Sequence, residues 1–286
     1  MPYQAEISRA RPAFFVFLVD QSGSMDGFTR DGKIKKDVVA ESLNRLLHQL
    51  INRCVVEKGI RNYFKIAVIG YGAGDRPGSV LQGGLAGFDF VTTSELDENK
   101  LGMDVIEEQY PDGNGGYVQR RRKVPMWVRP VAEGRTPMCA AFTKAYGLLD
   151  RWVSENYDHF PPVVLNLSDG WATDGDPTGI GKKIASLGTN DGQVLLFNLH
   201  LSSEESAFGN AGRPIVFPES PAGLDAKAAT MFEISSPLPD RMLGYAAEHN
   251  ISARAGARGF IHNAGADLVI KFLQIGTRNV PGGKGP

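Results

Sequence analysis

The 286-residue sequence is poor in cysteine, in net charge and in long apolar runs. Its two cysteines, Cys54 and Cys139, form neither a CxxC pair nor a disulfide framework, which is typical of a reducing compartment. The formal net charge is -1, so no global charge attracts the chain to nucleic acid or to an anionic membrane. Residues 1–6 lack the pattern of a signal peptide, and the apolar run 14–19 is too short to span a bilayer. We therefore expect a cytoplasmic protein with no membrane partner.

The signatures of common enzyme classes are also missing. Residues 175–183 contain Gly-x-Gly-Lys, but the spacing does not match a P-loop. Ser22 is not framed by Gly-x-Ser-x-Gly. A phosphatase of the haloacid-dehalogenase type needs a second Asp two residues after the first, and here Ser22 follows Asp20 at that spacing. The five histidines show no metal-ligand spacing and are interpreted as surface or satisfied core residues. Among them, His200 comes late in a predicted strand, in a position from which it can approach the sheet edge.

Apolar strands alternate with amphipathic helices along the chain. Residues 14–19 are continuously apolar, as in a strand buried on both faces, and residues 64–70 predict a second such strand. The segment 33–57 between them predicts a helix with one apolar stripe. This order implies parallel strands joined by a right-handed crossover. The polar face of that helix is expected to carry Lys35, Lys36, Glu41, Asn44 and Arg45.

The remaining pattern predicts an α/β fold, a doubly wound and mostly parallel sheet with helices on both faces. Further strands are expected at residues 161–167, 193–201 and 214–217, and further helices at 136–156, 176–187, 224–232, 238–248 and 264–275. We interpret residues 1–281 as one domain, with 42% hydrophobic residues to build its core, and residues 282–286 as a flexible tail.

Residues 71–133 are rich in glycine and turn residues and predict an elaboration on the sheet edge. Short β-like pieces are expected at 79–81, 88–92 and 117–131, and a helical fragment at 96–109. The segment also contains the basic run Arg120, Arg121, Arg122 and Lys123, flanked by Tyr117 and Trp127. Three interpretations of this run stay open: a solvated strand or loop, a surface for an acidic protein, and a nucleic-acid contact with aromatic stacking.

Polar clusters follow two of the buried strands. Residues 20–25 read Asp-Gln-Ser-Gly-Ser-Met, residues 168–170 read Ser-Asp-Gly, and a helix is predicted to begin at Thr136. These loops can meet at the carboxyl ends of parallel strands, where open α/β sheets bind ligands. The hydroxyls and carboxylates that would meet there suit a hard cation such as Mg²⁺. They belong to Asp20, Ser22, Ser24, Thr136 and Asp169.

An Asp and two serines after a strand are also typical of a turn and helix cap, so this motif alone has a structural alternative. With the threonine and the second aspartate in place, the five residues resemble the metal-ion-dependent adhesion site of the von Willebrand factor A (VWA) domain. That family's pattern is Asp-x-Ser-x-Ser, a distant Thr and a distant Asp, and this chain matches each position in order. The resemblance spans roughly residues 14–201. Asp174 and Asp176 lie outside the pattern, and Asp176 is predicted to cap a helix.

The resemblance implies how an ion would be held. Ser22 and Ser24 would coordinate Mg²⁺ directly, Thr136 directly or through water, and Asp20 and Asp169 mainly through coordinated waters and hydrogen bonds. Mn²⁺ and Ca²⁺ are alternative ions. An ion held mainly by neutral oxygens remains electron-poor and attracts an external Asp or Glu, which implies a binding role without catalysis.

Residues 134–138 and Met25 are similar to stand-alone bacterial VWA proteins of tellurium-resistance and stress-response gene clusters. That similarity implies a Mg²⁺-dependent scaffold beside a protein kinase and a phosphatase. We therefore expect a non-enzymatic adaptor whose partner supplies a carboxylate. Two alternatives stay open: a Mg²⁺-dependent phosphohydrolase with a base near Asp20, and a nucleic-acid-associated defence component that uses residues 120–123.

Overall fold

The fold is built on a mixed eight-stranded sheet. The computed structural model describes residues 2–74, 76–111, 116–201 and 213–277, and the strand order is β13-β14-β12-β9-β1-β4-β5, with β6 also paired to β4. Five strands are parallel to one another: β1 (Ala13–Asp20), β4 (Phe64–Tyr71), β9 (Val163–Ser168), β12 (Leu195–Leu201) and β14 (Phe260–Ala264). The short strands β5 (Gly78–Ser79), β6 (Val91–Thr92) and β13 (Ile215–Val216) are antiparallel at the edges.

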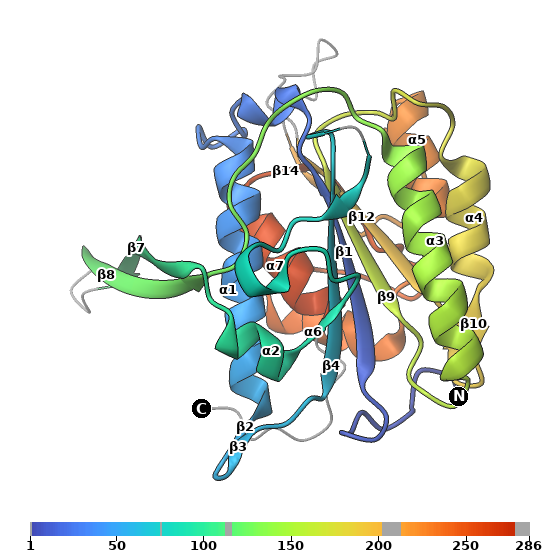
Figure 1. The fold of residues 1–286 in the computed structure, drawn as a ribbon. Coiled ribbons are helices and arrows are strands. Elements are labelled where there is room, and N and C mark those ends of the chain that lie inside the picture. Colours follow the sequence, from blue (N-terminus) through green and yellow to red (C-terminus); the bar gives the residue numbers. More distant parts are fainter. Residues whose placement is uncertain (1, 75, 112–115, 202–212, 278–286) are drawn as a thin grey trace.

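Helices cover both faces of this sheet (Figure 1). One layer contains α1 (Lys35–Cys54), α6 (Asp240–Glu248) and α7 (Ala266–Gly276). The other contains α3 (Met138–Glu155), α4 (Thr178–Ser186) and α5 (Ala226–Ile234). The predicted doubly wound α/β fold is therefore confirmed. Among the described residues, no helix has the length and apolar character needed to cross a membrane.

The apolar run of β1 is explained by its central position. Phe15, Phe17 and Val19 pack in the core on the α1 side, whereas Phe14 and Leu18 pack in the core on the α3 side. Both sets are almost fully buried because successive side chains of a strand point to opposite faces. The chain leaves β1 through α1 to reach β4 on one side and later places β9 on the other side. The carboxyl end of β1 is thus a topological switch point, where ligands of such sheets bind.

The predicted elaboration contains a hairpin rather than the expected helical fragment. Residues 96–109 do not form one helix: α2 (Thr93–Glu98) ends early and β7 (Gly102–Pro111) follows, paired along its length with β8 (Tyr117–Met126). Ladder pairing over ten residues overrides the helix propensity of its Met, Glu and Gln residues. A capping box between Thr92 and Glu95 fixes the start of α2.

The hairpin is tied to α1 at its base. Asn44 accepts hydrogen bonds from the backbone N–H groups of Trp127 (2.9 Å) and Val128 (3.0 Å) and donates to the carbonyl of Val128 (2.9 Å). Asn44 is 7% exposed, so its expected place on the polar face of the helix is wrong. Figure 1 shows the hairpin extending from the side of α1, away from the edge of the sheet where β1 ends.

The smaller described elements are two short ribbons and two 3₁₀ turns. The ribbons β2 (Val55–Val56) with β3 (Gly59–Ile60) and β10 (Gly188–Thr189) with β11 (Gly192–Gln193) follow α1 and α4, and η1 (Gly23–Asp26) and η2 (Gly83–Leu85) are single 3₁₀ turns. The sequence pattern does not predict β14, since only the helix after it has a clear period. The predicted tail 282–286 lies outside the described residues.

Candidate metal-binding site

The carboxyl ends of β1 and β9 bring two of the predicted loops together. These strands are parallel neighbours, with Val19 opposite Leu167, so Asp20 and Ser168 follow side by side. The Ser168 hydroxyl donates a 2.6 Å hydrogen bond to Asp20 Oδ2. The sheet register therefore places Asp20 beside the loop that carries Asp169.

The Asp-x-Ser-x-Ser loop folds tightly over the end of β1. The backbone N–H of Ser22 donates to Asp20 Oδ1 (2.9 Å), and the chain then turns through η1. Met25 is fully buried and anchors this turn in the core. The hydroxyls of Ser22 and Ser24 lie 3.1 Å apart, and the Ser24 hydroxyl donates to Asp169 Oδ1 (2.7 Å). Four of the five predicted residues thus form one connected oxygen cluster.

Thr136, the fifth residue, lies at the same place. A side chain added to Gly170 would begin 3.4 Å from the Thr136 hydroxyl and 3.9 Å from the Ser24 hydroxyl, so both hydroxyls border the space above Gly170. Two hydrogen bonds with Thr173 hold Thr136 there. The Thr173 N–H donates to the Thr136 carbonyl (2.9 Å), and the Thr136 N–H donates to the Thr173 hydroxyl (3.1 Å). The absence of a side chain at Gly170 leaves the space between the hydroxyls open. All five predicted residues therefore converge.

Electrostatics at the cluster favour a cation. Asp20 is 1% exposed, and burial raises its pKa to about 6, although hydrogen bonds from Ser168 and Ser22 act in the opposite direction. The negative charge of Asp169 raises the pKa of Asp20 further. Ser24 is exposed, so the cluster opens to solvent on one side. A buried carboxylate beside a second carboxylate is stabilised by a positive charge in the same place.

Sequence reasoning missed one charged member of the site, Lys35. Its ammonium donates to Asp169 Oδ2 at 2.8 Å, and the Lys35 and Asp169 side chains are 7% and 0% exposed. The expected place of Lys35 on the polar face of the helix is therefore wrong, because the loop before α1 turns its side chain inward. A signal was available: a lysine as the first residue of a helix is opposed by the helix dipole, so such a lysine needs another partner.

Aromatic rings form a wall beside Asp169. The His200 ring stacks between those of Trp171 (4.8 Å between centroids) and His262 (4.9 Å). Burial lowers the pKa of His200 to about 3, and the nearby His262 and Lys35 charges lower it further, whereas a hydrogen bond to the backbone of Asp169 raises it. The expectation that His200 reaches the sheet edge is confirmed, and its ring is neutral at pH 7.

Asp174 and Asp176 act on helix ends. Asp174 accepts hydrogen bonds from the backbone N–H groups of Cys139 (3.0 Å) and Ala140 (2.9 Å) at the start of α3. Asp176 accepts from the N–H of Thr178 (2.9 Å), the first residue of α4. The N-cap of α4 is Pro177, one residue later than the predicted Asp176. Among the described residues, no group of three or more His, Cys, Asp or Glu could hold a metal ion. Any ion here would therefore depend on the hydroxyls.

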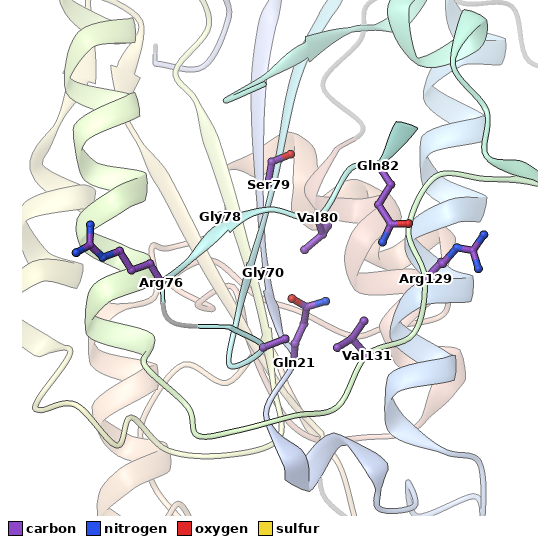
Figure 2. Close-up of a pocket in the computed structure, with 10 residues that line it drawn as sticks. Gln21, Gly70, Arg76, Gly78, Ser79, Val80, Gln82, Arg129 and Val131 are labelled. Atoms are coloured by element: carbon purple, nitrogen blue, oxygen red, sulfur yellow. The ribbon is translucent and has the colours of Figure 1, made fainter. Parts of the chain in front are cut away.

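A cavity of about 260 Å³ lies on the other side of the motif loop. Figure 2 shows Gln21, which stands between Asp20 and Ser22 in the chain, next to Gly70 and Val131 in this cavity. Gly70 has no room for a side chain, because a Cβ there would lie 2.0 Å from Gln21 Oε1. The side chains of Arg76 and Arg129 extend away from its centre (Figure 2). The cavity therefore has a neutral interior and a basic rim.

The basic run of β8 does not join the site. Arg121, Arg122 and Lys123 are exposed on the hairpin beside α1. Trp127 is 1% exposed and its indole N–H donates to the carbonyl of Leu96 (2.7 Å). Stacking of Trp127 on a nucleic-acid base, one of the open interpretations, is therefore excluded. The side chains of Tyr117 and Arg120 lie outside those that the structure describes.

No family model matches the chain, and no curated protein matches it. Among solved structures it is similar to the vWF domain of the type V pili tip protein Mfa5 from Porphyromonas gingivalis (14% identity, 57% of this chain, 39% of that chain, TM-score 0.32). It is also similar to the pilus adhesin SpaC from Lactobacillus rhamnosus GG (14% identity, 92% of this chain, 30% of that chain, TM-score 0.44). A third similar structure is the ArnB paralog VWA2 from Sulfolobus acidocaldarius (14% identity, 66% of this chain, 35% of that chain, TM-score 0.33).

The chain thus spans 30% to 39% of the length of these three solved chains. Two of the three are named for vWF or VWA domains. The α/β fold of this chain is established by its own sheet order and helix layers.

Proposed function

We propose that this chain is a VWA-type adaptor that holds Mg²⁺ at the carboxyl end of β1 and uses the ion to bind an acidic group of a protein partner. The observation that carries the proposal is the convergence of the Ser22, Ser24 and Thr136 hydroxyls with the Asp169 and Asp20 carboxylates. These residues come from three loops that are widely separated in sequence. A helix cap needs one such residue, whereas an ion needs several.

The donor set fits a hard cation. Every side-chain polar atom that the five residues offer is an oxygen, the ligand type preferred by Mg²⁺, Mn²⁺ and Ca²⁺. The two serine hydroxyls and Thr136 would contact the ion, and Asp20 and Asp169 would hold its water and the hydroxyls. The ion would supply a Lewis-acidic point to which a carboxylate can bind. It would also lower the cost of burying Asp20 as a carboxylate, whose pKa burial raises to about 6.

The surroundings favour an acidic partner and no reaction. Arg135, next to Thr136, is exposed, and Arg76 and Arg129 line the rim of the neighbouring cavity. These cations complement a partner that carries more than one carboxylate. The histidine beside Asp169 is a weak base, because burial lowers the pKa of His200 to about 3. We propose that the adaptor acts in the cytoplasm of a bacterium, in stress response or tellurium resistance, with a kinase or phosphatase as its partner.

Peptide binding tests the proposal while the partner itself is still unidentified. The probe is an array of peptides that each contain an Asp or Glu, paired with versions that contain Asn or Gln instead. Binding is expected only with Mg²⁺ and only to the acidic versions. Thr136→Ala should lose this binding, and Thr143→Ala, an exposed threonine of α3, should retain it.

Two results would contradict the proposal. One is peptide binding that persists in chelator or does not distinguish Asp from Asn. The other is robust Mg²⁺-dependent turnover of a generic phosphoester that is lost in Asp20→Ala, which would favour a hydrolase.

A further inference from the structure

Lys35 is bonded to the proposed metal-binding site, and the role inferred for it rests on that proposed function. Both carboxylate oxygens of Asp169 accept hydrogen bonds from side chains of the protein. Ser24 donates to Oδ1 at 2.7 Å, and the Lys35 ammonium donates to Oδ2 at 2.8 Å. The Asp169 side chain is 0% exposed, so solvent does not screen this ion pair.

The position of Lys35 is not explained by helix stability. Lys35 is the first residue of α1, where the positive end of the helix dipole disfavours a cation. Its neighbour Lys36 lies on the outside and pairs with Asp26. The Lys35 side chain is 7% exposed in this unfavourable helix position, and its ion pair with Asp169 holds it there.

The loop before α1 is shaped to deliver this ammonium. Residues 27–34 fold back on themselves through an antiparallel bridge between Phe28 and Ile34. The backbone N–H of Lys35 donates to the carbonyl of Gly27 (2.9 Å). A Cβ on Gly27 would lie 3.7 Å from the Lys35 ammonium, so the ammonium passes beside this glycine on its way to the site.

We propose that Lys35 is an internal counter-ion that competes with the divalent cation for Asp169 and sets the affinity of the site. Without Lys35, the site would offer two carboxylates, Asp20 and Asp169, to the ion. With Lys35, one ammonium offsets one of these two charges. A divalent ion must therefore bind against a fixed positive charge, and the ion-free cluster is held together by the lysine. The wild-type site therefore binds the ion less tightly than the same site without this charge would.

The test is a titration with Mn²⁺. Binding is measured as the decrease of the free Mn²⁺ signal in electron paramagnetic resonance. Lys35→Met keeps most of the side-chain volume and removes the charge, and it should lower the Kd for Mn²⁺ by about tenfold, which corresponds to about 1.4 kcal/mol. Lys35→Arg keeps the charge and should bind within about threefold of wild type. Lys33→Met removes an exposed lysine two residues away and should leave the Kd unchanged.

The outcomes separate this inference from the metal site itself. If wild type binds Mn²⁺ and Lys35→Met binds it equally or less tightly, the inference alone is overturned. Lys35 would then be a residue that only positions Asp169. An equal decrease of the Kd for Mn²⁺ in Lys33→Met would also overturn it, because the effect would then come from the net charge of the protein and not from the position of Lys35. Absence of Mn²⁺ binding in both wild type and Lys35→Met would overturn the metal site and the inference together. Circular dichroism of each variant confirms that it is folded.

Discussion

The carboxyl edge of the sheet and the β7–β8 hairpin carry the two polar features that the sequence singles out, and they differ in how their backbone is supported. Asp20 and Ser168 are the last residues of neighbouring strands of the core, and the Ser168 hydroxyl donates a hydrogen bond to Asp20. The basic run of β8 lies on a two-stranded ribbon with exposed Met103 and Val105 beside it. Convergent polar groups need a rigid frame, and only the sheet edge supplies one.

The two features also differ in how their side chains are directed. At the sheet edge, the polar side chains bond to partners that belong to other loops. On the hairpin, Arg122 and Lys123 extend from successive positions of one strand and therefore point to opposite faces. Arg121 and Lys123 share one face of β8, so the basic run divides its charges between the two faces of the ribbon.

The largest effect is expected where the hairpin is attached to α1. Asn44→Ala removes three hydrogen bonds at the base of the hairpin and leaves buried groups of Trp127 and Val128 without partners. The free energy of unfolding should fall by about 4 kcal/mol, measured by urea denaturation. Asn52→Ala, at an exposed position of the same helix, should change it by less than about 0.5 kcal/mol. Equal effects of the two variants would show that the hairpin base is not held by Asn44.

The next effect belongs to the site and depends on pH. The pKa of Asp20 is raised by burial from 3.8 to about 6, so the folded protein binds this proton more tightly than the unfolded chain does. The contribution of Asp20 to the free energy of unfolding is therefore present below about pH 4 and is lost as the pH rises to about 6. In the metal-free protein, Asp20→Asn should avoid this loss and be more stable than wild type at pH 7.5 by up to about 3 kcal/mol.

Urea denaturation of wild type and Asp20→Asn at pH 4.5 and 7.5, both in chelator, measures this difference. The advantage of the variant should shrink at the lower pH. An advantage that is equal at both pH values would contradict the burial of a charged Asp20. Ser186→Ala, an exposed position in α4, is the control.

The smallest effect is expected on the hairpin. Arg122→Ser combined with Lys123→Ser should change the free energy of unfolding by less than about 0.5 kcal/mol, because both side chains are exposed. The same variant should retain the full response to Mg²⁺ in a thermal denaturation experiment. A lost response would show that the two regions are coupled.

Much of this architecture follows from the sequence because its signals are local. The apolar run of β1 and the 3.6-residue period of α1 are read directly, and the parallel order then brings Asp20 and Asp169 to one edge. The β7 strand was missed because its Met, Glu and Gln residues favour a helix and its main support is the partner strand β8. Lys35 was missed because its direction depends on the loop before α1 and on an aspartate 134 positions away.

The central claim is that the oxygen cluster at the end of β1 binds a divalent cation, and thermal denaturation with and without Mg²⁺ tests it most directly. At a Mg²⁺ concentration of a hundred times its Kd, wild type should gain about 2.7 kcal/mol of stability. The double variant Ser22→Ala/Ser24→Ala should gain none, while Ser186→Ala should match wild type. An equal gain in the double variant, or no gain in wild type at any Mg²⁺ concentration, would contradict the claim.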